Sequence, residues 1–416
     1  MAILLFALAM WPSSMRKPAS ADWLNTYVLA GQEMIAHQPI HSAGRNALNA
    51  GPFTYPPAAA LLAVPFASSP PMFALFAWYI ASLVATCNAV DSAWRLAGGP
   101  SFARMTRHLS IICAIGILLA LRYLTSPFGN RQIDMFVAAT VLLGCWFLAR
   151  RRDVSGAIYI GIAAAIKATP LLFAPYLAWR GRWLAAAVVV AIALGLNLLP
   201  DVVWPQKSGE SYVTQWREIS LAPVRSGMTG EWFADPLRNQ SIAGVVGRIA
   251  RFGFLASPAQ IAASDDATNA ESARAAKLVT YAIDLLLLGI TAFCLGWRRR
   301  DNSRTAVEFG AVVCLMLLLS PMTSKSHLCV LILPLFLIAR AIVERRTAGW
   351  IALGVALALL GPLAARDVIG RQLSDYSMAW GLPVLFIFLN LAGMWTLART
   401  APLEVREPAA TTPYST

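Results

Sequence analysis

The chain has 416 residues, of which 58% are hydrophobic and only 13% are charged. Soluble domains contain about 25% charged residues, and a single soluble core stops growing well before this length. These values exclude a soluble protein and predict a multi-span membrane protein. The 34 Lys and Arg outnumber the 21 Asp and Glu, which gives a net charge of +13. Because the basic residues stand in clusters between apolar runs, we interpret the excess as a signal of membrane orientation and not of nucleic-acid binding.

The first apolar run, from Ala2 to Trp11, is shorter than a membrane span. It is either part of a signal peptide that is cleaved before Asp22 or a short first span. No basic segment precedes the run, as a signal peptide requires, so the short span is the better interpretation. Both interpretations place the segment from Pro12 to Tyr55 on the outer face.

Longer apolar runs follow along the rest of the chain. The block 155–179 is interrupted by Lys167 and Pro170, which predicts two short helices that meet at a bend. Together with the first run, these segments predict an all-α, polytopic transmembrane helix bundle of about 11–12 membrane segments. We expect one membrane domain over residues 1–398 and a disordered cytoplasmic tail over 399–416. The other expected spans lie near residues 71–91, 108–122, 132–149, 183–199, 277–297, 305–320, 327–344, 348–365 and 378–398.

Basic residues are distributed unequally between the two sets of connectors. The connectors on the side of Arg150–Arg152 carry 16 Lys and Arg in 52 residues, whereas the short connectors on the opposite side carry 7 in 71. Cytoplasmic loops of membrane proteins are enriched in basic residues. The asymmetry therefore predicts that the outer loops are 13–56 and 201–276, with short outer turns at 123–131 and 321–326.

The first outer loop combines a carboxylate with aromatic residues. Trp23, Tyr27 and Met34 recur at near-helical spacing, which predicts an interfacial helix lying on the membrane. Asp22 would stand in its first turn. There it either caps the helix or acts as a general base on an acceptor hydroxyl. The residues themselves leave both roles open.

A second polar cluster occupies the outer turn that ends at His327. A single His at the edge of a membrane usually forms a hydrogen bond at a helix end. Its neighbour Lys325 suggests a second role, because Lys acts as a point charge for phosphate. Arg131, in the turn 128–132, adds another cation on this face.

Lys167 is an ionisable residue inside an apolar block. Such residues are costly in a membrane and are functional candidates by default. The alternative is that its ammonium extends to the membrane surface while its stem stays in the apolar layer. The two roles have equal support from the sequence, and at the expected bend Lys167 would share the outer face with Asp22 and His327.

Several catalytic motifs are absent. The sequence contains no GxxxxGK[ST], HExxH or GxSxG pattern, so nucleotide hydrolysis, zinc proteolysis and serine hydrolase chemistry have no support. The sequence also shows no soluble nucleotide-binding domain. If the protein uses a sugar donor, that donor would therefore be lipid-linked. Asp22 has no acidic neighbour, so we expect no cofactor and no tight metal site, and assistance by a divalent metal stays open.

At this point the pattern resembles glycosyltransferase family 87, a family of the GT-C superfamily of polytopic enzymes that use polyprenyl-phosphate sugars. The motifs that carry the resemblance follow the family's order over most of the chain. They are Asp22 with Tyr27 and Gly31, Tyr55-Pro56-Pro57, Gly129 with Gln132, the block Gly161 to Pro170, the run Asn239-Gln240-Ser241, and Ser320-Pro321 with His327.

The resemblance implies a GT-C fold and an inverting transfer of a hexose, by family analogy mannose. The donor would be a polyprenyl-phosphate sugar, and the acceptor a lipid or glycan at the outer face of the plasma membrane. Asp22 would be the catalytic base. The leaving phosphate would be held by His327, Lys325, Lys167 and Arg131. The implied substrate-binding residues are Tyr27, Tyr55, Gln132, Asn239 and Gln240.

Two other functions use the same kind of lipid. A transporter or flippase of lipid-linked sugars predicts inverted repeats and ionisable residues near the membrane midplane, whereas the ionisable candidates here gather at one face. A glycan polymerase or ligase would transfer a whole oligosaccharide from a lipid-linked donor. Both remain alternatives to transfer of a single sugar.

Overall fold

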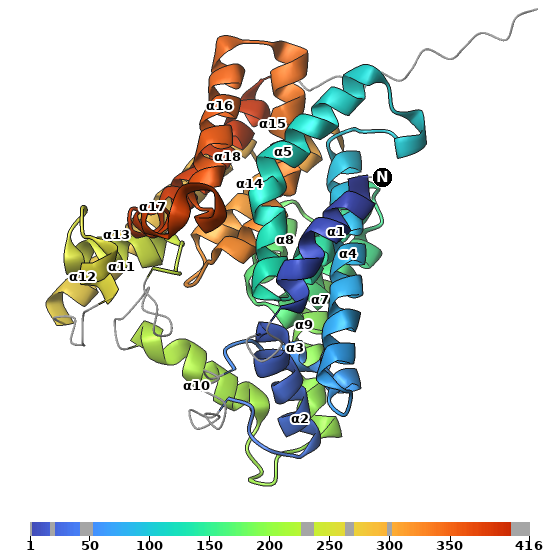
Figure 1. The fold of residues 1–416 in the computed structure, drawn as a ribbon, viewed down its shortest axis with the longest axis vertical. Helices are drawn as coiled ribbons and strands as arrows, with labels where there is room; N and C mark the ends of the chain where they lie inside the picture. The colour runs from blue at the N-terminus through green and yellow to red at the C-terminus, as the bar shows by residue number, and fades with distance from the viewer. Residues whose placement is uncertain are drawn as a thin grey trace, which may run out of the picture.

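The computed structural model of the protein describes residues 2–16, 21–41, 53–225, 237–262, 270–297 and 302–400. All regular secondary structure in these ranges is helical (Figure 1). The all-α fold expected from the sequence is therefore confirmed. Most of the predicted cytoplasmic tail, residues 401–416, lies outside the described ranges.

Six helical stretches in the described ranges are long and apolar enough to cross a membrane. A seventh is the pair α16 (Ala348–Leu363) and α17 (Arg366–Ala379), which is bent by 88° at the break between the two helices. Shorter apolar helices are α1 (Ala2–Met15), α6 (Asp134–Ala149) and α7 (Asp153–Ile166). The expected polytopic bundle is thus confirmed. The six stretches are α4 (Pro71–Leu96), α5 (Arg107–Asn130), α9 (Trp183–Val203), α13 (Ala270–Leu295), η7 with α15 (Lys325–Leu331 and Ile332–Arg345), and α18 (Leu382–Arg399).

The apolar block around Lys167 folds as two helices with a bend, as the sequence predicts. α7 ends before Lys167, whose backbone is extended. The short η6 (Thr169–Leu172) and α8 (Phe173–Trp179) follow. Pro170 has no backbone N–H to donate to the carbonyl of Ile166, so α7 cannot continue through it, whereas a proline fits the first turn of the new helix η6.

Several helices lie where connectors were expected. α5 continues to Asn130, so the expected turn 123–131 is reduced to a reversal at Arg131, whose φ is 54°. α17 occupies the expected connector 366–377 and is kinked at Gly370. The large outer loop contains α10 (Tyr212–Arg225), α11 (Ile242–Phe252) and α12 (Pro258–Ala262), and η5 (Phe102–Arg104) lies between α4 and α5.

The first outer segment forms η2 (Trp23–Val28) and α2 (Leu29–Ile35), as expected for a helix, but its aromatic face packs against protein and not against the membrane surface. Trp23 and Tyr27 are almost fully buried. A Cβ added to Gly31 would lie 3.1 Å from the backbone of the segment between α3 (Ala58–Leu61) and η4 (Val64–Phe66). This close approach fixes η2 and α2 on the bundle, which offers the aromatic rings more complete packing than a lipid headgroup layer.

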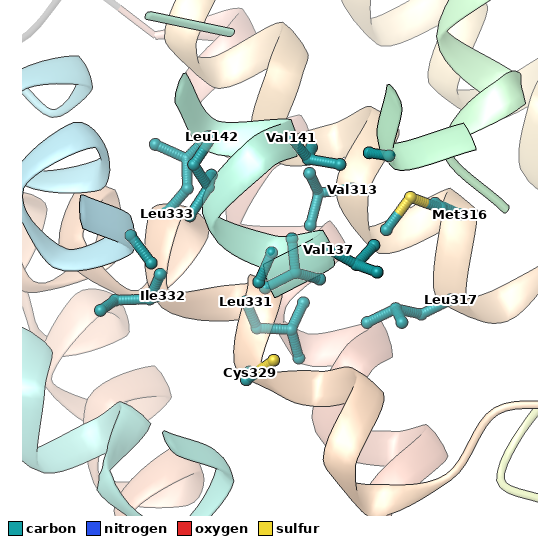
Figure 2. Packing of buried hydrophobic residues seen from close by; sticks show 14 of the residues in the cluster. Val137, Val141, Leu142, Val313, Met316, Leu317, Cys329, Leu331, Ile332 and Leu333 are labelled. Atoms are coloured by element: carbon teal, nitrogen blue, oxygen red, sulfur yellow. The ribbon is translucent and has the colours of Figure 1, made fainter. Parts of the chain in front are cut away.

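A hydrophobic core holds the first turns of α6 beside η7 (Figure 2). Side chains from α6, from α14 (Asn302–Leu318) and from the η7–α15 junction interdigitate there, and all are at most 5% exposed. Inside a membrane, such contacts stabilise mainly through close van der Waals packing. The labelled residues are Val137, Val141 and Leu142 of α6, Val313, Met316 and Leu317 of α14, and Cys329, Leu331, Ile332 and Leu333.

A buried ion pair joins α8 to α14 at the opposite end of the broken block. Arg180 donates to both carboxylate oxygens of Glu308, each at 2.8 Å. The Tyr176 hydroxyl donates to the same carboxylate at 2.7 Å. Because both charges are paired and hydrogen-bonded, this ion pair connects α8 to α14 without leaving an unpaired buried charge.

Candidate active site

Asp22 does not cap the helix that it precedes. It occupies the N-cap position of η2 but forms no side-chain capping hydrogen bond. Instead its Oδ2 accepts a hydrogen bond of 3.0 Å from Nε2 of Gln132. Burial raises the pKa of Asp22 above its usual value, while the Gln132 hydrogen bond and the charges of Arg238 and Arg131 oppose the rise. The capping role considered from the sequence is therefore replaced by a carboxylate held by a neutral amide.

Gln132 is fixed by its own backbone. Its carbonyl accepts from Nε1 of Trp78 in α4 at 3.3 Å, and its N–H donates to Pro127 at the end of α5. The reversal between α5 and α6 therefore presents the Gln132 amide to Asp22. The structure thus brings together two residues that the sequence named for different roles.

Arg131 occupies the same reversal but faces α1. Its guanidinium donates to the backbone carbonyls of Ser13 and Ser14, at 3.3 Å and 3.1 Å, and of Arg16. These bonds satisfy carbonyls at the C-terminal end of α1. Arg131 therefore connects α1 to the reversal that carries Gln132, and its predicted contact with a phosphate stays a prediction.

A second carboxylate, Asp134, lies between two predicted phosphate ligands. Its side chain is 3% exposed. Lys167 Nζ donates to Asp134 Oδ1 at 2.6 Å, and His327 Nε2 lies 3.6 Å from the same oxygen. We call Asp134, Lys167 and His327 the buried triad. It joins the first turn of α6, the break after α7 and η7.

His327 has a defined orientation in this triad. Its Nδ1 accepts a hydrogen bond of 3.2 Å from the backbone N–H of Ser324, as part of a capping box at the start of η7. The proton of a neutral ring then resides on Nε2, which faces Asp134. His327 thus does form the helix-end hydrogen bond considered from the sequence.

Asp134 is the main residue that the sequence interpretation missed. It stands in the first turn of an apolar helix, two residues after Gln132. An acid in such a run is costly unless it is paired, and Lys167 is the cation of the next apolar block. One acidic and one basic residue in successive apolar blocks therefore could have indicated that Asp134 pairs with Lys167.

Tyr27 and Tyr55 lie near both carboxylates. Their ring centroids are 5.1 Å apart, and Lys167 Nζ is 5.7 Å from the Tyr55 ring centroid. Burial raises the pKa of both phenols, and the charges of Asp134 and Asp22 raise them further. Both hydroxyls therefore keep their protons and can donate hydrogen bonds.

Asn239 and Gln240 bind the outer turn from the start of α11. Asn239 Nδ2 donates to the Pro321 carbonyl at 2.8 Å, and its Oδ1 accepts from the Thr323 N–H at 3.2 Å. Gln240 Nε2 donates to the Met378 carbonyl at the end of α17 at 2.9 Å. Both side chains are fully buried. They hold the turn that carries Lys325 and His327, and their predicted contacts with substrate are not tested by these bonds.

Lys325 lies apart from the buried triad. Its Nζ donates to the backbone carbonyl of Ala364, at the end of α16, at 3.1 Å. Arg122 Nη2 of α5 donates to the same oxygen at 3.0 Å. Arg122 is hard to single out from the sequence as a site residue, because it stands at the edge of an apolar run where basic residues are common.

The described side chains include no group of three or more His, Cys, Asp or Glu that could hold a metal ion. The arrangement offers instead a half-buried carboxylate near neutral donors, a charge-neutralised buried triad, and cations at the end of α16. These groups can remove a proton from a hydroxyl and stabilise an anionic leaving group without a change of oxidation state.

A family model described as glycosyltransferase family 87 matches residues 53–321 of the chain, more than half of its length. The chain is 26% identical to a polyprenol-phosphate-mannose-dependent alpha-(1-2)-phosphatidylinositol mannoside mannosyltransferase of Mycobacterium tuberculosis, over 91% of the chain and 83% of that relative. A protein of the same description from Mycolicibacterium smegmatis is also 26% identical, over 92% of the chain and 86% of the relative.

A third relative matches a smaller part of the chain. It is a polyprenol-phosphate-mannose-dependent alpha-(1-2)-phosphatidylinositol pentamannoside mannosyltransferase of Mycobacterium tuberculosis, 30% identical over 36% of the chain. The aligned part spans 34% of that relative's length. No solved structure matches the chain.

Proposed function

Because the chain belongs to glycosyltransferase family 87, we propose that this membrane glycosyltransferase moves mannose from a polyprenyl-phosphate-mannose donor to a lipid or glycan acceptor. The two mannosyltransferases that align with more than nine tenths of the chain support mannose as the sugar and a phosphatidylinositol mannoside as the kind of acceptor. The asymmetry of basic residues supports a plasma-membrane orientation in which Asp22 faces outward.

The observation that carries the proposal is the state of Asp22. Its carboxylate is not used as a helix cap and accepts a hydrogen bond from the Gln132 amide. An acceptor hydroxyl would give its proton to Asp22 while its oxygen forms a bond to the anomeric carbon of the donor. The bond from that carbon to the phosphate oxygen breaks, and the electron pair leaves with the phosphate. Attack opposite the leaving group inverts the anomeric configuration.

The four predicted phosphate ligands have different surroundings. Asp134 compensates the charge of Lys167 and faces His327, while Arg131 binds the end of α1. In our proposal the buried triad lies beside the donor, where Lys167 and the Nε2 proton of His327 are preorganised donors. Lys325 supplies a cation from the neighbouring turn.

Transfer by purified protein in liposomes tests this proposal. We expect wild-type protein to add one labelled mannose from polyprenyl-phosphate-mannose to a phosphatidylinositol mannoside. Asp22→Asn removes the base while keeping the shape of the side chain, and we expect a loss of at least 100-fold in rate, the lower end of general-base contributions. Asp91→Asn, which removes a carboxylate from a half-buried ion pair with Arg95, is the matched control and should keep full activity.

The alternatives give other products in the same assay. Relocation of the labelled donor without a new glycosidic bond would identify a flippase, and failure to use the monosaccharide donor would favour a polymerase or ligase. Near-normal transfer by Asp22→Asn would remove Asp22 as the base.

A further inference from the structure

Two cations converge on one neutral oxygen at the outer end of α16. Arg122 Nη2 and Lys325 Nζ donate to the carbonyl of Ala364 at 3.0 Å and 3.1 Å. Ala364 is the C-cap of α16, and a helix end of this kind attracts a cation. The carbonyl oxygen has two lone pairs and can accept both hydrogen bonds, but the two cations that share it repel each other.

The charges around this carbonyl are not balanced. Among the described residues, neither Arg122 nor Lys325 has a carboxylate within ion-pair distance. A third cation, Arg366, is already paired with Asp375 at 2.8 Å. The charges of Arg122, Arg366 and Arg238 repel Lys325, whereas Asp375 attracts it. Asp367 attracts Arg122 without forming an ion pair with it.

Donor groups also remain unused here. Within the described ranges, Nε of Arg122 is buried and has no hydrogen-bond partner. A buried donor without a partner is unfavourable by itself, and a guanidinium presents its donors in a fork that fits two oxygens of one phosphate. Arg122 and Lys325 together match the charge and the donors that one phosphate group needs.

The two cations are held in place by structure on either side. Arg122 projects from α5, which packs against η7 and α16. Lys325 begins η7, directly after the turn that Asn239 binds through Pro321 and Thr323. Neither side chain is therefore a mobile surface charge.

In the buried triad, by contrast, the positive charge has a counter-ion. Lys167 forms an ion pair with Asp134 at 2.6 Å, so its positive charge is already compensated. An approaching phosphate gains less from such a pair than from cations that lack a counter-ion. The charge balance therefore favours the end of α16 over the triad as the place where a full negative charge rests.

We propose that Arg122 and Lys325 form a binding site for one phosphate group of a lipid substrate. The phosphate belongs either to the polyprenyl-phosphate donor or to the phosphodiester of a phosphatidylinositol acceptor, which present the same chemistry. This site deepens the proposed function and rests on it for the identity of the lipids.

Binding by the purified full-length protein in detergent tests the site without turnover. The probes are undecaprenyl phosphate, phosphatidylinositol and, as a neutral lipid, undecaprenol. We expect Arg122→Gln and Lys325→Gln each to raise the Kd of one phospholipid by about 10-fold or more. The lipid that loses affinity identifies the source of the phosphate. The affinity for undecaprenol should stay unchanged.

Arg371→Gln is the matched control, because it removes one positive charge from the neighbouring helix α17 at a side chain that is 84% exposed. It should bind all three lipids as wild type does. If Arg122→Gln does not fold, two other variants test the site. Lys325→Gln should weaken phosphate binding, and Arg122→Lys, which keeps the positive charge, should weaken it less.

Unchanged affinity of Lys325→Gln for both phospholipids, or an equal loss for undecaprenol, would overturn the site. Its failure is distinct from failure of the proposed function. Wild-type transfer of mannose together with unchanged phosphate binding in the variants would reject the site alone. Phosphate binding that depends on Arg122 and Lys325 in a protein that transfers no mannose would reject the function alone.

Discussion

Two carboxylates near the start of α6, Asp22 and Asp134, have the same chemistry and different surroundings. Asp22 is half-buried and bound by the amide of Gln132. Asp134 is almost fully buried and bound by the ammonium of Lys167. Protonation of Asp134 would break a buried ion pair, whereas protonation of Asp22 breaks none in the part of the chain that is described. Asp22 is therefore the better proton acceptor, and Asp134 the better positioning residue.

Gln132 influences the pKa of Asp22, the proposed base. Its hydrogen bond lowers the pKa of Asp22 against the larger effect of burial, which raises it. Gln132→Leu removes the bond, so the pKa of Asp22 rises further. When the pH is lowered, Asp22 then becomes protonated at a higher pH than it does in the wild type. We expect the acid limb of kcat/KM to move to higher pH, and kcat/KM at the pH of half-maximal wild-type activity to fall by about threefold to tenfold.

The measurement is the pH profile of mannose transfer. Gln372→Leu, an exposed amide on α17, is the control and should leave the profile unchanged. An acid limb that stays in place in Gln132→Leu would show that this amide does not act on the base.

The Lys167–Asp134 pair should show strong coupling. Lys167→Met leaves a buried carboxylate without its cation and should lower the unfolding free energy by about 3 kcal/mol. The double variant with Asp134→Asn removes both charges, so we expect it to be more stable than the sum of the two single effects predicts. Unfolding in mixed detergent micelles measures this.

A surface pair provides the comparison. Arg95→Met breaks the ion pair with Asp91, whose side chains are more than a third exposed, and should change the unfolding free energy by less than about 1 kcal/mol. Additive effects of the Lys167 and Asp134 substitutions would mean that the buried pair is not coupled.

At the scale of elements, two glycines set how closely α6 and α7 pack. A Cβ at Gly144 would lie 2.7 Å from Ile160 and 2.9 Å from the carbonyl of Gly156, and a Cβ at Gly156 would lie 2.7 Å from the carbonyl of Gly144. Small residues at helix contacts let membrane helices approach closely. This contact determines the distance between the start of α6, with Asp134, and the end of α7, with Lys167.

Gly144→Val should therefore affect both stability and activity. We expect overpacking to lower the unfolding free energy by about 1–3 kcal/mol, with a loss of transfer activity as α7 shifts. Gly289→Val in α13, where an added Cβ meets nothing within 4 Å, is the matched control and should change stability by less than about 0.5 kcal/mol. Equal stability of the two variants would contradict the packing argument.

The elements that sequence predicted are those whose signal is local. Runs of apolar residues identify the spans, and Pro170 identifies the break after Lys167. α17 was missed because four charged residues lower its hydropathy, although they lie on one amphipathic helix. The inward packing of η2 was also missed, because the partners of Trp23 and Tyr27 come from segments that periodicity does not connect.

At the scale of the whole molecule, sequence analysis placed Lys167 and His327 on one face but could not supply what joins them. The bond from Lys167 to Asp134 spans 33 positions, and that from Arg122 to Ala364 spans 242. Contacts of this kind depend on how the helices pack. Charge counts sort loops to the two sides of the membrane and carry no information on which buried charges meet.

The buried triad also has a consequence for synthesis of the chain. Asp134 and Lys167 leave the ribosome close together, so their charges can neutralise each other soon after α6 and α7 enter the membrane. His327 follows 160 positions after Lys167. Asp22 is made before these residues, but its hydrogen-bond partner Gln132 is translated only 110 positions later. The candidate site is therefore complete only after segments far along the chain have been made. A chain halted before η7 would hold the Asp134–Lys167 ion pair but lack His327, the third member of the triad.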